Sequence, residues 1–130
     1  MKLKKTHLIA LVSTALLAIP LIAVFAADIL VEIQVSPNVL NLANNGQVVT
    51  VHTDIPYSLV VGASVYLNDV PIDWWKSDDC GNFVAKFEIN AIKDIVEVGP
   101  ATLTLTGDTI TGETFCGVDE IEVIDKSSNK

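Results

Sequence analysis

Basic side chains are scarce in this chain of 130 residues, which has 8 lysine and arginine residues against 16 aspartate and glutamate residues. Three of the basic residues, Lys2, Lys4 and Lys5, lie at the extreme N-terminus, before a long apolar run. The remainder of the chain carries 5 basic and 16 acidic residues, which is a net charge of −11. A surface with this charge repels nucleic acid and anionic lipid, so neither is an expected partner.

The sequence also lacks the short motifs that are typical of common catalytic sites. It contains no G-x-S-x-G nucleophile turn, no glycine-rich phosphate loop and no H-E-x-x-H zinc motif. His52 is the one histidine after the N-terminal apolar run, and Asp54 shares its side of a predicted strand, with Ser58 nearby in sequence. This arrangement is typical of an exposed strand, so no catalytic residue is predicted and the chain is not expected to be an enzyme.

Cysteine is rare as well, with 2 residues, Cys80 and Cys116. Two distant cysteines and a single histidine are too few for a structural zinc site, which needs four ligands. An even number of cysteines in an exported protein favours a disulfide instead. We therefore expect a bond between Cys80 and Cys116, which would stabilise the folded state by about 3–4 kcal/mol on the chain-entropy estimate.

A single long apolar run is present, over residues 8–26, and it directly follows the basic N-terminus. Val24 and Ala26 occupy the −3 and −1 positions of a cleavage site before Ala27. A basic start, an apolar stretch and small residues at the cleavage site are the layout of a secretory signal peptide. We therefore predict a signal peptide over residues 1–26.

The alternative to a cleaved leader is an uncleaved membrane anchor, because residues 8–27 are just long enough to span a bilayer. Pro20, near the end of the run, fits a cleavage region better than the middle of a membrane helix. Membrane association is expected only if the leader is retained. The protein is predicted to be secreted, in the extracellular space or at the cell surface.

The rest of the chain alternates apolar and polar residues in short runs, which is the pattern of half-buried β-strands. Residues 29–35 and 82–89 show this pattern clearly. After them, "NAIKDIVEVGP" has helical spacing, with Asn90 as the expected N-cap and Gly99 near its end. The residues expected to face the core are Ile29, Val31, Ile33, Val35, Phe83, Ala85, Phe87, Ile89, Leu103, Leu105, Ile121 and Val123.

Eight or nine short strands and one short helix predict an all-β fold, an antiparallel immunoglobulin-like β-sandwich over residues 27–125. Residues 55–63 are expected to be a connection, since Pro56 cannot donate to a strand ladder. Residues 71–76 are expected to be the second arm of a hairpin, and residues 126–130 a flexible tail. The tryptophan that antibody domains place between their two cysteines is missing, because both tryptophans precede the first cysteine.

An acidic turn offers a candidate calcium site. Asp73, Asp78, Asp79 and Asn82 lie close together in sequence, and calcium takes several oxygen ligands from a flexible loop. The D-x-[DN]-x-[DN]-G spacing is not present, because Cys80 and the glycine after it occupy ligand positions. Turns are also rich in these residues without binding metal. Apart from calcium, no cofactor is expected.

Four aromatic residues, Trp74, Trp75, Tyr57 and Tyr66, form a candidate ligand-binding set. Adjacent strand residues point to opposite faces, so one of the two tryptophans is expected to be in the core and the other on the surface with one of the tyrosines. Exposed aromatic rings suit flat ligands such as sugar rings. A partly covered structural tryptophan is the alternative, and the sequence does not decide which tryptophan faces water.

Several stretches together resemble a recurrent immunoglobulin-like all-β accessory module of secreted bacterial and archaeal proteins. They are "VEIQVSPNVLNL", "GQVVTVHTDIPY", "VYLNDVPIDWWKSDDCGNFVAKFEINAIKDIVE" and "ATLTLTGDTITGETFCGVDEIEVID". The resemblance covers most of the chain after the leader and implies an extracellular module with no catalytic residues to assign. The two cysteines depart from the usual pattern of the module.

These observations predict a secreted or cell-surface β-sandwich module with a structural or protein-interaction role. Its expected partners are other extracellular or surface proteins or a polysaccharide, and self-association through strand edges is a further expectation. The alternative function is a carbohydrate- or calcium-binding accessory module that uses residues 73–82.

Overall fold

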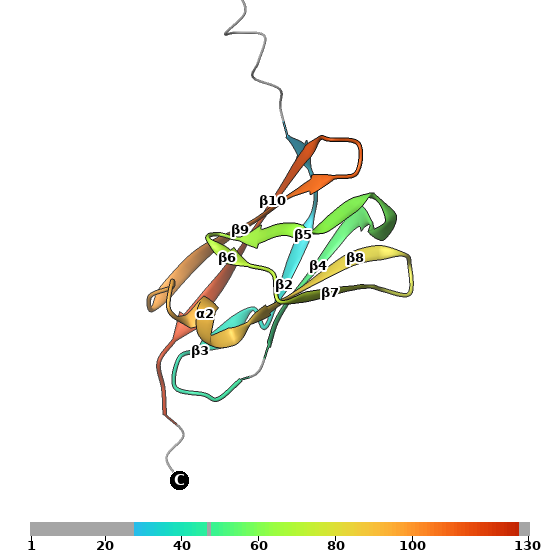
Figure 1. The fold of residues 1–130 in the computed structure, drawn as a ribbon. Coiled ribbons are helices and arrows are strands. Elements are labelled where there is room, and N and C mark those ends of the chain that lie inside the picture. Colours follow the sequence, from blue (N-terminus) through green and yellow to red (C-terminus); the bar gives the residue numbers. More distant parts are fainter. Residues whose placement is uncertain (1–27, 47, 128–130) are drawn as a thin grey trace, which may run out of the picture.

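The computed structural model describes residues 28–46 and 48–127 (Figure 1). The elements are β1 (Ile29–Leu30), β2 (Ile33–Ser36), β3 (Val39–Asn41), β4 (Val48–Pro56), the 3-10 helix η1 (Tyr57–Leu59), β5 (Val60–Leu67), β6 (Val70–Pro71), β7 (Trp74–Ser77), β8 (Asn82–Glu88), α2 (Ile89–Lys93), β9 (Gly99–Thr109) and β10 (Thr114–Ile124). The predicted signal peptide and residues 128–130 of the predicted tail lie outside the described residues. Within the described ranges, no helix has the length and apolar content that crossing a membrane requires.

The strands form two sheets. One has four strands in the order β2-β4-β8-β7. The other has six, in the order β1-β10-β9-β5-β6 with β3 also paired to β10. Neighbouring strands are antiparallel except that β1 and β3 run parallel to β10. The predicted all-β sandwich with very little helix is therefore confirmed.

One apolar core fills the space between the sheets, with side chains from both. Its largest members are Phe83 and Phe87 of β8 and Phe115 of β10, all with no exposed surface. Nine of the twelve residues that were predicted to face the core are buried, because strand alternation separates buried from exposed positions within one strand. The predicted inward residues that are buried are Val35, Phe83, Ala85, Phe87, Ile89, Leu103, Leu105, Ile121 and Val123.

The prediction of one strand over residues 29–35 is wrong, because the chain changes sheet within it. β1 pairs with β10, and the amide of Val31 donates to the Cys116 carbonyl at 3.0 Å. The chain then crosses to the other sheet, where β2 pairs with β4. A Cβ on Gly117 of β10 would lie 2.8 Å from the Val31 carbonyl oxygen, so a glycine makes room for this crossing. Val35, after the crossing, is buried.

Two further stretches also differ from the prediction. Residues 55–63 are not a connection: β4 continues through Pro56, η1 turns the chain, and β5 starts at Val60. The proline is tolerated because it is the last residue of β4. Residues 71–76 are not one hairpin arm either, since β6 pairs with β5 in the six-stranded sheet and β7 pairs with β8 in the other.

The predicted helix exists but is short. α2 has 5 residues, its N-cap is Glu88 rather than the predicted Asn90, and it joins β8 of one sheet to β9 of the other. Ile92 is fully buried, whereas Ile95 is 41 % exposed after the helix has ended. The helix is therefore a connection between the sheets, anchored in the core by its buried isoleucines.

Candidate functional site

The four aromatic residues of the predicted binding set do not share one surface. Trp74 pairs with the outward Lys86 on the four-stranded sheet, and Tyr66 lies on the outer face of the other sheet. Tyr57 in η1 stacks on the core residue Phe83, with ring centroids 6.2 Å apart and planes at 28°. Trp75 points between the sheets. A platform built from all four residues is therefore excluded by the fold.

Trp75 has a structural role at the open edge of the sandwich. It pairs with the buried Ala85, so its side chain is on the inner face of β7. A Cβ on Gly62 of β5, in the opposite sheet, would lie 2.1 Å from Cε2 of Trp75. The ring therefore lies directly on the backbone of Gly62 and closes the gap between the sheets. Its exposed fraction, 37 %, is that of a residue at the rim of a core.

Trp74 is the tryptophan on the outer face, and it is 47 % exposed. Across the strand pair, Lys86 places its Nζ 5.5 Å from the centroid of the Trp74 ring, a cation–π contact. The same Nζ donates a hydrogen bond of 2.9 Å to Oγ1 of Thr50 on β4. Both partners are neutral groups, so neither offsets the positive charge of the ammonium. These contacts hold Trp74 and Lys86 in a defined arrangement on the surface.

Strand register extends this arrangement across all four strands of the sheet. Trp74, Lys86, Thr50 and Ser36 form one row, and Lys76, Val84, His52 and Gln34 form the next. We call these eight positions the Trp74 face. It contains no aspartate or glutamate, although the chain has 16. Acidic residues border the face at both ends, with Glu88 opposite Val48 at one end and Asp54 at the other.

Val84 provides the base of the Trp74 face. Its side chain points outward by strand alternation and is not part of the core cluster between the sheets, yet it has no exposed surface. By register its neighbours on the face are His52, Lys76 and Lys86, whose side chains are longer than its own. Lysine stems commonly cover apolar surface while the ammonium groups stay in water. Of the two lysines, Lys86 is half-buried and Lys76 is exposed.

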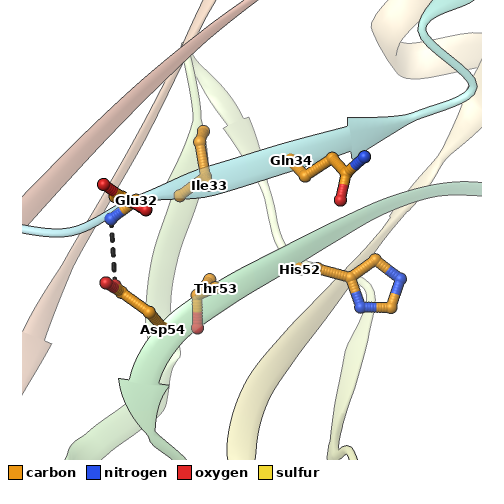
Figure 2. A pocket seen from close by; sticks show the side chains of 6 residues that line it. All are labelled: Glu32, Ile33, Gln34, His52, Thr53 and Asp54. Atoms are coloured by element: carbon orange, nitrogen blue, oxygen red, sulfur yellow. Dashed lines mark hydrogen bonds between the residues drawn. The ribbon is translucent and has the colours of Figure 1, made fainter.

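A shallow pocket continues the face toward the edge strand β2. It has a volume of about 220 Å³ and is lined by Glu32, Ile33, Gln34, His52, Thr53 and Asp54 (Figure 2). His52 and Asp54 lie on the same side of β4, as predicted. The Asp54 carboxylate does not orient the imidazole, however: its Oδ1 accepts a hydrogen bond of 2.9 Å from the backbone amide of Glu32. The pocket therefore offers polar binding groups next to the Trp74 face.

The acidic turn that was predicted as a calcium site is organised by hydrogen bonds within the protein. Oδ1 of Asp78 accepts bonds from the backbone amides of Cys80, at 2.8 Å, and Asn82, at 2.9 Å. In the part of the chain that the structure describes, no three side chains of His, Cys, Asp or Glu come together as metal ligands, and this includes Asp73, Asp78 and Asp79. The role of Asp78 is therefore to fix the turn between β7 and β8.

The predicted disulfide between Cys80 and Cys116 is wrong, because both cysteines are free. Cys80 is exposed in the β7–β8 turn of the four-stranded sheet. Cys116 lies on β10 of the other sheet, between the inward residues Phe115 and Gly117, so its side chain points to the outer face. The fold therefore places the two thiols in different sheets, and counting cysteines cannot detect such a separation.

The sequence indicated the pair Trp74 and Trp75 without deciding which of them faces water, and it did not indicate the residues around Trp74. Thr50, Lys76 and Lys86 looked like ordinary outward strand residues, and their grouping depends on the order and register of three strands. The one usable signal was that Lys86 alternates with the core residues Ala85 and Phe87, which predicts an outward position but not its neighbours.

No family model matches this chain, and no curated protein or solved structure matches it either. The resemblance to secreted all-β modules therefore depends on the sequence stretches quoted above. Function has to be argued from the surface itself.

Proposed function

We propose that this protein is a non-catalytic, extracellular carbohydrate-binding module, and that it binds its ligand on the Trp74 face. The observation that carries the proposal is Trp74 itself, 47 % exposed and in contact with Lys86 on the outer face of a sheet. Aromatic rings bind the apolar faces of flat ligands while neighbouring polar groups fix their orientation.

The chemistry around Trp74 favours a sugar over an apolar ligand. Hydroxyl, amide, imidazole and ammonium groups share the face with the ring, with Lys86 beside it, and the one aliphatic side chain of the face, Val84, is covered. Sugar hydroxyls both donate and accept hydrogen bonds, so Ser36, Thr50 and Gln34 match them in both directions. The core of a protein interface would instead be expected to have more apolar surface.

The immunoglobulin-like arrangement is part of the same proposal. The order β2-β4-β8-β7 corresponds to the A-B-E-D sheet of that fold, and β10-β9-β5 corresponds to its G-F-C sheet. The extracellular location is supported by the sequence of the leader and by the resemblance to modules of secreted proteins. A carbohydrate-binding role requires no catalytic residue. The Asp54 carboxylate, for example, is used in a hydrogen bond to the backbone.

Replacing Trp74 by alanine tests the proposal. A central aromatic residue of a binding site contributes about 2 kcal/mol or more, which is a loss of affinity of roughly 30-fold. Tyr66→Ala is the matched control, because Tyr66 is 44 % exposed on the outer face of the other sheet. Affinity electrophoresis through gels containing different polysaccharides measures the retention of each variant. If Trp74→Ala leaves the retention unchanged, the sugar binds elsewhere and the proposed site is wrong.

A protein-binding role, through the outer face of the six-stranded sheet, is the second candidate. Exposed apolar side chains gather there: Leu30 is 84 % exposed, Val118 57 % and Tyr66 44 %. Leu30 and Tyr66 lie in one row with Cys116, and Val118 is two residues further along β10. Val118→Lys would disrupt such an interface. A role in self-association predicts that light scattering detects oligomers of the wild-type protein and monomers of this variant.

A further inference from the structure

We propose that the ligand of the Trp74 face is an anionic polysaccharide, whose carboxylate or sulfate groups bind Lys76 and Lys86 while a sugar ring packs on Trp74. This inference rests on the proposed function and adds the chemical class of the ligand to it. The observation behind it is the unequal distribution of charge over the molecule.

The positive charge is concentrated on this face. The described residues contain four lysines, and two of them, Lys76 and Lys86, are among the eight positions of the Trp74 face. Their diagonal placement on neighbouring strands puts their Cα atoms roughly 7–8 Å apart. The eight positions thus carry two lysines and no carboxylate, and acidic residues such as Glu88 and Asp54 lie only at their borders.

The contacts of Lys86 leave it able to bind an anion. Its ammonium has three donors, and one of them binds Thr50 at 2.9 Å. The contact with Trp74 holds the charge next to the ring, where a sugar would pack. A sugar that carries an acidic group can therefore engage the ring and the ammonium together. Because the contacts with Thr50 and Trp74 already hold Lys86, less of its side-chain entropy is lost on binding.

The acidic remainder of the protein determines how such a ligand can bind. Elsewhere the surface repels a polyanion, so binding is confined to the Trp74 face. The Debye length is about 10 Å at 0.1 M salt and about 3 Å at 1 M. Near 0.1 M salt, distant acidic residues are therefore screened while direct contacts with the lysines persist. We expect binding at this concentration and its loss as salt approaches 1 M.

The experiment compares polygalacturonate with its fully methyl-esterified form, which has the same backbone without the charge, by affinity electrophoresis of the full-length purified protein. Dextran sulfate and dextran form a second pair that distinguishes sulfate from carboxylate as the source of charge. The test variant is Lys76→Gln with Lys86→Gln. The control is Lys93→Gln with Lys126→Gln, which removes the same charge outside the face. Lys86→Arg preserves the charge beside Trp74.

We expect at least one charged polymer to bind about tenfold more tightly than its neutral counterpart, because the neutral polymer lacks the charge contacts with both lysines. The test variant should lose this preference, while the control variant and Lys86→Arg retain it. If charged and neutral polymers are retained equally and Trp74→Ala abolishes this retention, the inference is wrong but the proposed function stands. Retention of no polymer, or retention independent of Trp74, would overturn both. A melting curve for each variant separates lost binding from lost folding.

Discussion

The contact between Trp75 and Gly62 gives the sharpest test of how the two tryptophans are assigned to opposite sides of β7. In the variant Gly62→Ala, the new Cβ would lie 2.1 Å from Cε2 and 2.5 Å from Cδ2 of the ring. Carbon atoms in contact are normally about 3.5–4.0 Å apart, so the ring has to move by more than 1 Å. Overpacking of this kind costs about 1–3 kcal/mol. For a domain of this size we expect the melting temperature to fall by roughly 4 °C or more.

A double-mutant cycle shows whether the ring is the cause. In a Trp75→Ala background the clash cannot occur, so Gly62→Ala should destabilise the protein much less than it does in the wild type. The expected coupling energy is about 1–3 kcal/mol, within the range of residues in contact. Trp74→Ala is the matched control, because that ring is on the other face of β7. Its combination with Gly62→Ala should be additive to within about 0.5 kcal/mol.

Urea unfolding followed by far-ultraviolet circular dichroism measures these free energies without relying on tryptophan fluorescence, which the variants alter. The reasoning is refuted if Gly62→Ala is equally destabilising with and without Trp75. Coupling of Gly62 to Trp74 instead would mean that the two tryptophans are assigned to the wrong faces.

Two further predictions concern the β7–β8 turn and the cysteines. Asp78→Ala removes the acceptor of two backbone hydrogen bonds and should lower the free energy of unfolding by about 1–3 kcal/mol. In the control Asp79→Ala, which replaces an exposed residue, this free energy should change by at most about 0.5 kcal/mol. Equal effects of the two variants in urea titrations would contradict the role given to Asp78. Because Cys80 and Cys116 are free, a thiol reagent should modify both in the unfolded protein without prior reduction. If a reducing agent lowered the melting temperature, the two cysteines would instead form a disulfide, which stabilises the folded state by about 3–4 kcal/mol.

The sequence was a good guide to which residues of a strand face the core. Phe83, Ala85 and Phe87 alternate with Val84, Lys86 and Glu88, and all three are buried in the core. This works because the two-residue period of a strand is a local property. The same local pattern failed for residues 29–35, which continue to alternate while the chain moves from one sheet to the other.

The candidate site was less accessible to sequence reasoning. Trp74 and Trp75 are adjacent and chemically identical, and alternation states only that they point in opposite directions. Trp75 faces inward because Gly62, 13 positions earlier in the chain, provides a gap for its ring. Trp74 is then left on a face whose other members come from β2, β4 and β8 and, with Lys76, from β7 itself.

The sequence by itself determined the all-β class, a short helix after residue 88, nine of the buried core residues and the acidic character of the chain, because these depend on composition and on periodicity within one segment. The tertiary structure decided which strands are neighbours. That choice left Cys80 and Cys116 unpaired in different sheets, and it placed Lys86 and Thr50 beside Trp74. Sheet order and register depend on contacts between distant segments, and a period of two residues carries no information about them.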